Sequence, residues 1–456
     1  MYIDPTFKKM YYILKGRMYM NFIFKILARL NVLTLCLALI CGNFSGFTAT
    51  ELEYETAYGN PMKGFMPFYS EEGADDSVPY SMEWLYIPMT DLVADDGTLT
   101  LREGLEHKLE TIARRGHQAA LRVYLDYPDK ECAVPQFIWD MGVKKYEYSE
   151  YGGGVSPDYS DQRLIDFLLD FIDKFALNYD GDKRIAYITT GLIGHWGEWH
   201  VCSEIKQAMA TDRQKRQILH AFEFYFQHTK ILTRYPGTPG SNNGQIGFHD
   251  DSFTYNTINS EKYYFFYNQL KKALKTNIWK TQPIGGEFRP EGQESFLKGE
   301  VTDDFQDYDE CVDKTHCSWL MMTGAFTGNL TEDEINTAKE ASAKLGYDFY
   351  VSKVQVLNLF GKAYVRVGVK NVGVAPIYDN PSVYIGTDRE EVETNQSIGK
   401  ILPSETEYFT AIIDLESGDN VHIRISDLSN YGAYVRFSNV GGSTSQDGSF
   451  VIGSVK

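Results

Sequence analysis

Short apolar runs alternate with amphipathic stretches between residues 60 and 325, and this alternation constrains the fold more than any other feature of the chain. Eight of the runs have the composition and length of β-strands. They cover residues 64–69, 82–89, 119–126, 185–194, 231–234, 246–249, 282–286 and 318–323. Eight strands that alternate with helices over about 250 residues predict a (β/α)8 barrel of the TIM type.

Helical periodicity between the runs supports this prediction. Leu101, Leu105, Leu109 and Ile112 fall on one face of a helix, which ends in a basic turn before Gly116. Similar apolar stripes occupy residues 164–175, 262–274 and 331–345.

We expect the barrel to be irregular. Only about a dozen residues separate the first two strands, and residues 237–245 are rich in Gly, Pro and Asn without a helical pattern. A different α/β arrangement is the alternative.

The pattern changes after Gly346. Residues 349–456 contain short alternating segments such as KAYVRVGVKN and NVHIRISDL, separated by turn residues. Five to seven such strands in this length predict a C-terminal β-sandwich domain. We therefore expect an α/β chain with a leader at 1–49, an irregular barrel at 50–346 and a β-sandwich at 347–456.

The N-terminus has the layout of a secretory signal. Six basic residues precede an uncharged apolar run at 32–40, which is too short to span a bilayer comfortably. We expect cleavage within 42–50 and export to the periplasm, the cell surface or the medium. Cys41 offers an alternative, a lipoprotein anchor that would hold the chain at the cell surface.

The net charge of −18 argues against nucleic acid as a partner. Removal of the leader makes the chain more acidic still, because the leader holds six basic residues and one acidic residue.

Four cysteines would remain after cleavage. There is no C-x-x-C pair, so a structural zinc site is not expected. In an exported protein Cys311 could pair with Cys317, and Cys132 with Cys202; four cysteines allow three connectivities.

Two glutamates in Gly- and aromatic-rich turns are the candidate catalytic residues. Glu198 lies in HWGEWH, at the end of the fourth strand. On an extended segment Trp196, Glu198 and His200 would share one face. An acid between an indole and an imidazole should have a raised pKa, which a general acid for a glycosidic oxygen requires.

Glu287 lies in PIGGEF, at the end of the seventh strand. Strands four and seven place the two carboxylates across the mouth of a barrel, where barrel enzymes carry out their chemistry. Glu198 would be the acid/base, and Glu287 the nucleophile, or the base in an inverting scheme. The alternative is that both acids are structural, Glu198 paired with Arg122 and Glu287 with Arg289.

The glutamates of strands four and seven resemble those of the large clan of retaining glycosidase barrels. That clan has Asn before its acid/base glutamate, where this chain has Gly197. Four segments, NPMKGF, GLEHKLETIARRGHQAALRVYLDYP, GLIGHWGEWH and LGYDFYV, resemble the paired DUF4874/DUF4832 proteins. The resemblance spans nearly the whole mature chain and implies an exported bacterial protein with a glycosidase-like barrel. It implies no substrate, because those proteins have no assigned function.

Polar and aromatic residues at other strand ends are expected to orient a sugar, with Trp196 or Trp199 as a stacking platform. The full set is Trp84, Arg122, Asp126, Trp196, Trp199, His200, Arg234, His249 and Asp250.

No other chemistry has a comparable signature. The chain has no G-x-S-x-G, no P-loop and no G-x-G-x-x-G after a strand, so we expect no nucleotide cofactor. His195 and His200 would point apart on an extended segment, and no H-E-x-x-H occurs, so we expect no metal. The predicted function is hydrolysis of an oligo- or polysaccharide. The alternative is a non-catalytic glycan-binding or surface scaffold protein with a degenerate barrel.

Overall fold

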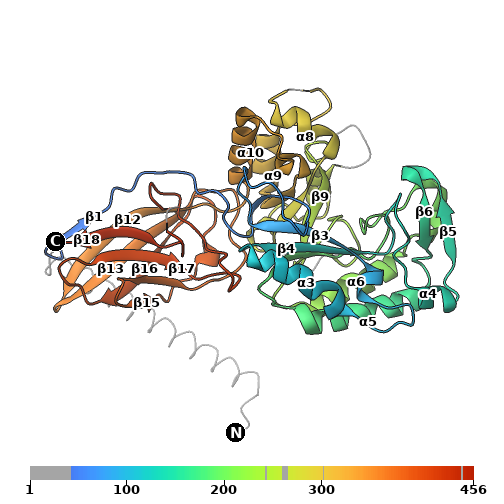
Figure 1. Cartoon of the computed structure of the whole chain (residues 1–456), viewed down its shortest axis with the longest axis horizontal. Coiled ribbons are helices and arrows are strands. Elements are labelled where there is room, and N and C mark those ends of the chain that lie inside the picture. Colours follow the sequence, from blue (N-terminus) through green and yellow to red (C-terminus); the bar gives the residue numbers. More distant parts are fainter. Residues whose placement is uncertain (1–42, 242–243, 259–264, 301, 443–444) are drawn as a thin grey trace, which may run out of the picture.

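The computed structural model describes residues 43–241, 244–258, 265–300, 302–442 and 445–456 (Figure 1). The predicted signal sequence up to residue 42, with the alternative anchor Cys41, lies outside these residues. Within these ranges no helix combines the length and the apolar character that a membrane crossing needs.

Eight parallel strands form one sheet in the order β2-β11-β10-β9-β8-β7-β4-β3. They are β2 (Gly64–Met66), β3 (Met82–Pro88), β4 (Gln118–Tyr124), β7 (Ile185–Thr189), β8 (Lys230–Thr233), β9 (Gly247–Phe253), β10 (Ile284–Phe288) and β11 (Trp319–Met321). The edge strands meet through a bridge between Phe68 and Trp84, beside which the Tyr69 N–H donates to the Trp84 carbonyl at 2.9 Å. The sheet therefore closes into a barrel, and each of the eight predicted runs supplies one strand.

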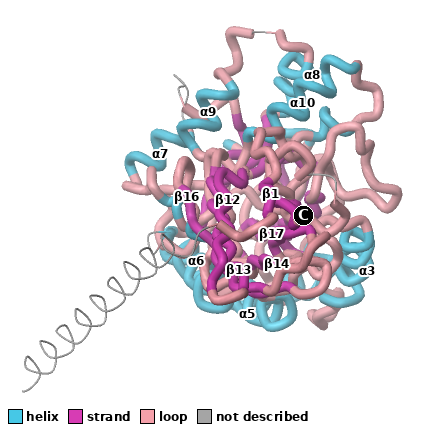
Figure 2. Tube along the Cα trace, turned by 90° about the vertical axis from the view of Figure 1, so that its left-hand side faces the viewer, coloured by secondary structure: helices cyan, strands magenta, loops and turns pink. Residues whose placement is uncertain are grey.

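Helices surround the barrel, as the view along the long axis shows (Figure 2). They are α2 (Met89–Leu92), α3 (Leu101–Arg114), α4 (Gln136–Asp140), α5 (Gln162–Tyr179), α6 (Asp212–Tyr225), α7 (Phe266–Lys272), α8 (Pro290–Leu297), α9 (Tyr308–Thr315) and α10 (Glu332–Lys344). The predicted stripe of α3 is buried against the barrel. The predicted irregularity is confirmed, because the described residues form no α-helix between β2 and β3 or between β8 and β9.

Aromatic side chains fill the barrel interior toward the end where the strands begin. Trp319 is fully buried, with its ring centroid 5.7 Å from that of Trp84 and 5.7 Å from that of Tyr187. Gly285 on the neighbouring strand makes room for this indole, since a Cβ there would lie 2.0 Å from Trp319 Cε2. The interior is a packed core, so a site can lie only at the end of the barrel where the strands finish.

The C-terminal part is the predicted β-sandwich. Its two antiparallel sheets have the orders β12-β13-β16 and β1-β18-β17-β14-β15. The strands are β1 (Phe47–Ala49), β12 (Phe349–Leu359), β13 (Lys362–Asn371), β14 (Val383–Gly386), β15 (Glu391–Glu393), β16 (Thr406–Ile413), β17 (Asn420–Ile425) and β18 (Phe450–Val455). Alternate residues such as Val365, Val367 and Ile423 have no exposed surface and form the core between the sheets.

The sandwich packs on the end of the barrel where the strands begin. The Asn60 side-chain amide donates to the Arg436 carbonyl at 3.0 Å, and the Tyr347 hydroxyl donates to the Pro61 carbonyl at 2.8 Å. The opposite end, where the strands finish, faces away from the sandwich (Figure 1). The sandwich therefore does not cover the mouth of the barrel, the end where the strands finish.

The first residues that the structure describes lie in the sandwich, before the predicted boundary at residue 49. β1 pairs with β18, and Tyr54 donates a 2.8 Å hydrogen bond to Asp348 before the chain enters the barrel. Phe44 and Phe47 pack against the sandwich core.

The predicted disulfides are wrong for the described residues, because Cys132, Cys202, Cys311 and Cys317 are all free thiols. Cys132 is exposed whereas Cys202 is buried. Cys311 on α9 contacts Gln306, while Cys317 donates to the Trp319 carbonyl at 3.4 Å, so the two sulfurs are directed to different partners.

Alkylation should confirm the free thiols. We expect protein unfolded in guanidinium without reductant to carry the label on all four cysteines, and native protein to label first at the exposed Cys132. Peptide mass spectrometry reads the result. If any of the four cysteines takes the label only after reduction, its sulfur is paired in a disulfide.

Gly285→Ala should destabilise the barrel by about 2–3 kcal/mol, because the added methyl group cannot fit beside Trp319 without moving the ring. The matched control is Gly237→Ala, where the nearest atom would be Gln269 Oε1 at 3.8 Å and the expected change is within about 0.5 kcal/mol. Urea unfolding followed by tryptophan fluorescence compares the two variants. Equal stabilities would contradict the packing described above.

Candidate active site at the barrel mouth

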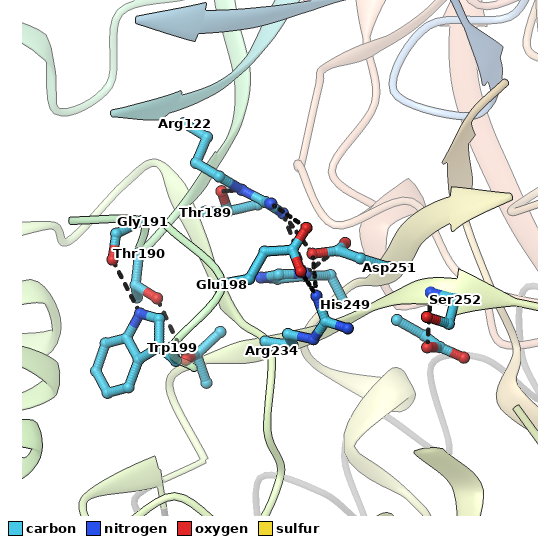
Figure 3. Close-up of polar contacts among 12 residues, drawn as sticks. Arg122, Thr189, Thr190, Gly191, Glu198, Trp199, Arg234, His249, Asp251 and Ser252 are labelled. Carbon is cyan, nitrogen blue, oxygen red and sulfur yellow. Dashed lines mark hydrogen bonds and ion pairs between the residues drawn. The ribbon is translucent and has the colours of Figure 1, made fainter. Parts of the chain in front are cut away.

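Arg122 on β4 occupies the centre of the mouth, and Figure 3 shows its contacts. Its side chain is 1% exposed. The guanidinium donates to Thr189 Oγ1 at 2.8 Å, to the Tyr86 hydroxyl at 3.0 Å and to Asp251 Oδ2 at 3.0 Å. One buried cation thus joins strands β3, β4, β7 and β9.

Glu198 is held between two arginines. Its carboxylate pairs with Arg234 Nη1, and its Oε1 lies 3.6 Å from Arg122 Nη1. The side chain is 11% exposed, so part of it remains accessible from the mouth. The structural alternative was therefore right about Arg122 as a partner, and these charges favour the carboxylate form over the proton donor that we predicted.

The turn that carries Glu198 is not extended. Trp196, Gly197 and Trp199 have φ angles of 52°, 67° and 63°, and the His195 N–H donates to the His200 carbonyl at 2.9 Å. A Cβ on Gly197 would lie 2.9 Å from Gly191 Cα, which accounts for glycine at this position. The predicted extended backbone is therefore wrong for this segment, although Glu198, His200 and Trp196 do lie next to one another.

Glu287 at the end of β10 keeps a small exposed part, and most of its side chain is buried in protein. Burial raises the pKa of its carboxyl to about 8, and the charge of Asp251 adds to this, whereas Arg122 and Arg234 act in the opposite direction. Glu287 is therefore mostly neutral at pH 7. Its predicted structural partner Arg289 instead binds Glu291 at 2.6 Å.

Asp251 is a central residue that the sequence analysis did not place among the predicted site residues. Its carboxylate accepts from Arg122, lies 3.3 Å from Arg234 Nη1 and contacts His249 Nδ1 at 2.8 Å. Burial alone would raise its pKa, but the charges of Arg122 and Arg234 and the hydrogen bond with His249 hold the pKa well below the ordinary value. Parity on β9 could have found it, because His249 and Asp251 share a face.

The predicted residues Arg122, Arg234 and His249 do meet at this centre, but they contact the carboxylates rather than the open mouth. Burial lowers the pKa of His249 to about 4, so this imidazole is neutral. These three side chains therefore position the acids.

Two of the predicted aromatic residues border the mouth. His200 Nε2 lies 3.3 Å from Glu198 Oε2, and burial lowers the pKa of its imidazole. The half-buried Trp196 has its ring centroid 5.8 Å from that of His200. Trp196 and His200 are therefore placed to contact a ligand.

Four predicted sugar-binding residues are buried among protein atoms, Trp84 directly beside Arg122, and this burial does not support a contact with a sugar. Trp84 is buried inside the barrel, and the Trp199 indole is buried and donates to the Gly191 carbonyl at 2.9 Å. Asp250 faces away from Arg122 on β9 and accepts from Thr257 Oγ1 at 2.8 Å; burial raises its pKa to about 6. Asp126 is 1% exposed and accepts from Tyr148 and Ser156.

Among the residues that the structure describes, no three His, Cys, Asp or Glu side chains are grouped as a metal-binding set.

A sequence comparison finds no matching family model and no matching curated protein. The structure is similar to endo-glycoceramidase II from Rhodococcus sp. (TM-score 0.38, 10% identity, 80% of this chain and 100% of that one). It is also similar to GH5_18 from Bifidobacterium longum, with a TM-score of 0.36 and 11% identity over 57% of this chain and 69% of that one. Xylanase 10B from Thermotoga maritima is similar with a TM-score of 0.37 and 10% identity over 62% of this chain and 94% of that one. These likenesses are distant, and the strand order itself establishes the barrel.

The raised pKa of Glu287 predicts a pH dependence of stability. The ordinary pKa is 4.5 and the folded value is about 8, so the folded state binds this proton more tightly. The resulting stabilisation is complete below pH 4.5 and is lost as the pH rises through 8. Glu287→Gln removes this dependence. Between pH 5 and 8 the free energy of unfolding of the variant, relative to that of the wild type, should therefore rise by on the order of 3 kcal/mol.

Urea unfolding at several pH values measures this difference, with Glu291→Gln as the control because Glu291 is exposed. Parallel stability curves for the wild type and Glu287→Gln would mean that Glu287 is ionised in the folded protein.

Proposed function

We propose that the chain is a glycoside hydrolase that acts on an oligo- or polysaccharide, with Glu287 as the proton donor and Glu198 as the nucleophile or the base. The observation that carries the proposal is the contrast between these two acids at one barrel mouth. Burial keeps Glu287 neutral, whereas two arginines contact Glu198. Acids whose environments favour opposite ionisation states are the usual pair for acid/base work on a glycosidic bond.

The roles are the reverse of those predicted from the sequence. Glu287 would donate its proton to the glycosidic oxygen as the bond to the anomeric carbon breaks. Glu198 would then form the bond to the anomeric carbon, or would take a proton from the water that does so. In the first case Glu287 recovers its proton from the water that releases the sugar.

The balance of charge supports this assignment. Arg122 and Arg234 carry two positive charges, and Glu198 and Asp251 supply two negative ones. A third carboxylate would have no matching cation in this buried cluster, so Glu287 keeps its proton at neutral pH.

A second candidate is glycan binding without turnover. The contacts of Glu198 with two arginines favour it, because ion pairs of this kind also occur in purely structural networks. In that case the mouth would bind a sugar and leave it intact.

Export belongs to the proposal as well, on the basis of the basic and apolar N-terminal segment. So does membership of the paired DUF4874/DUF4832 proteins, because one of the resembling segments, GLIGHWGEWH, carries Glu198 at the mouth.

A glycan-library hydrolysis screen tests the function. We expect the wild type to release reducing sugar from at least one substrate, with activity falling as the pH rises through 8 because Glu287 loses its proton. Glu287→Gln and Glu198→Gln should each lower kcat about 100- to 10,000-fold, whereas Glu291→Gln should not. Full activity in Glu287→Gln would refute the proton-donor role, and binding without turnover in every form would favour the second candidate.

A further inference from the structure

A hairpin beside the mouth carries an exposed aromatic residue that the sequence analysis did not single out. Strands β5 (Lys145–Tyr148) and β6 (Gly154–Pro157) follow β4 and pair antiparallel. The hairpin stands at the end of the molecule opposite the sandwich (Figure 1). Its tip is a single helical turn, Glu150–Gly152, which includes Tyr151.

The hairpin is fixed to the body of the barrel through the buried Asp126. This carboxylate accepts from the Tyr148 hydroxyl at 2.7 Å and from Ser156. It also contacts His195 Nδ1 at 2.7 Å, while His195 Nε2 accepts from the Cys202 N–H at 2.9 Å. The hairpin and the turn that carries Glu198 are therefore held by one acid.

A second set of contacts fixes the tip itself. Glu204 accepts from the Ser149 N–H at 2.8 Å and from the Ser149 hydroxyl at 2.7 Å. Glu150 accepts from the Ser203 hydroxyl and from the Glu204 N–H. Glu150 in the tip and Glu204 in the segment after β7 thus fix the residues that immediately precede Tyr151.

Tyr151 is in an unfavourable conformation for an exposed aromatic residue. Its φ is 58°, in the left-handed region that side chains other than glycine rarely adopt, and the residue is 54% exposed. Such strain persists where the surroundings impose it, and it concentrates at ligand-binding positions.

The ring of Tyr151 continues a line of side chains that begins at Glu198. His200 contacts Glu198 at 3.3 Å, and the ring of Trp196 lies 5.8 Å from that of His200. The ring of Tyr151 lies 5.2 Å from that of Trp196, centroid to centroid, with 63° between the ring planes, so the two rings form an angled pair. On the other side of Trp196, the ring of Tyr127 contacts it edge-on, with the two ring centroids 6.3 Å apart. Lys130 Nζ lies over the ring of Tyr127.

We propose that Trp196 and Tyr151 form an aromatic shelf that binds a sugar residue other than the one cleaved at Glu198 and Glu287. This proposal rests on the proposed function and gives its substrate class, a chain of at least two sugar residues rather than a simple monosaccharide glycoside. The C–H faces of a pyranose ring stack on indole and phenol rings, and the fixed hairpin presents those rings without a further ordering cost.

Binding experiments in the inactive Glu287→Gln background test the shelf apart from the reaction. A glycan array first selects an oligosaccharide of three or more residues, and titration calorimetry then compares it with its own monosaccharide. We expect Tyr151→Ala and Trp196→Ala each to weaken oligosaccharide binding about ten-fold while monosaccharide binding changes less than two-fold. Tyr151→Phe should retain the affinity, because the ring rather than the hydroxyl makes the contact.

The matched control is Tyr431→Ala in the sandwich, a substitution of another tyrosine that is 53% exposed. It should leave the affinity for both ligands unchanged. Unaltered oligosaccharide binding in Tyr151→Ala and Trp196→Ala, equal losses for both ligands, or no glycan bound on the array would overturn the shelf. Selective binding with no hydrolysis by the wild type would retain the shelf and reject the hydrolase.

Discussion

The buried guanidinium of Arg122 is the group on which the arrangement of the mouth depends. A cation with almost no exposed surface is costly unless every donor has a partner, and this one has partners from β3, β7 and β9 together with the carboxylate of Glu198. Removal of a single partner would leave one of its buried donors without an acceptor. The four strand ends are therefore coupled, and the position of Glu198 follows from that coupling.

The same charge sets the state of the other acids. Asp251 balances Arg122 and Arg234 on one side, and Glu198 balances them on the other. The two cations are then matched, and burial of Glu287 outweighs the remaining attraction of Arg122 and Arg234, so its pKa stays raised. Glu287 therefore holds its proton at neutral pH, whereas two guanidinium groups contact Glu198, and acid-catalysed cleavage of a glycosidic bond needs two acids in such different surroundings.

The sequence predicts the strands well and the side-chain directions less well. Apolar runs identify all eight barrel strands, and strand counting places Glu198 and Glu287 at one end of the barrel, because these features depend on local composition and chain order. The contacts of Arg122 depend on which residues of β9 point inward, and there Asp251 rather than Asp250 does so. Trp199 turns into the core because three residues of an irregular turn have positive φ, which no alternating pattern can indicate.

The central claim is that one glutamate at the mouth is neutral while its neighbour is ionised, and NMR titration of carboxyl groups labelled with carbon-13 tests it most directly. We predict one glutamate resonance in the wild type that titrates near pH 8 and is absent from Glu287→Gln. A spectrum in which the resonance lost in Glu287→Gln titrates near the ordinary glutamate value of 4.5 would contradict the account.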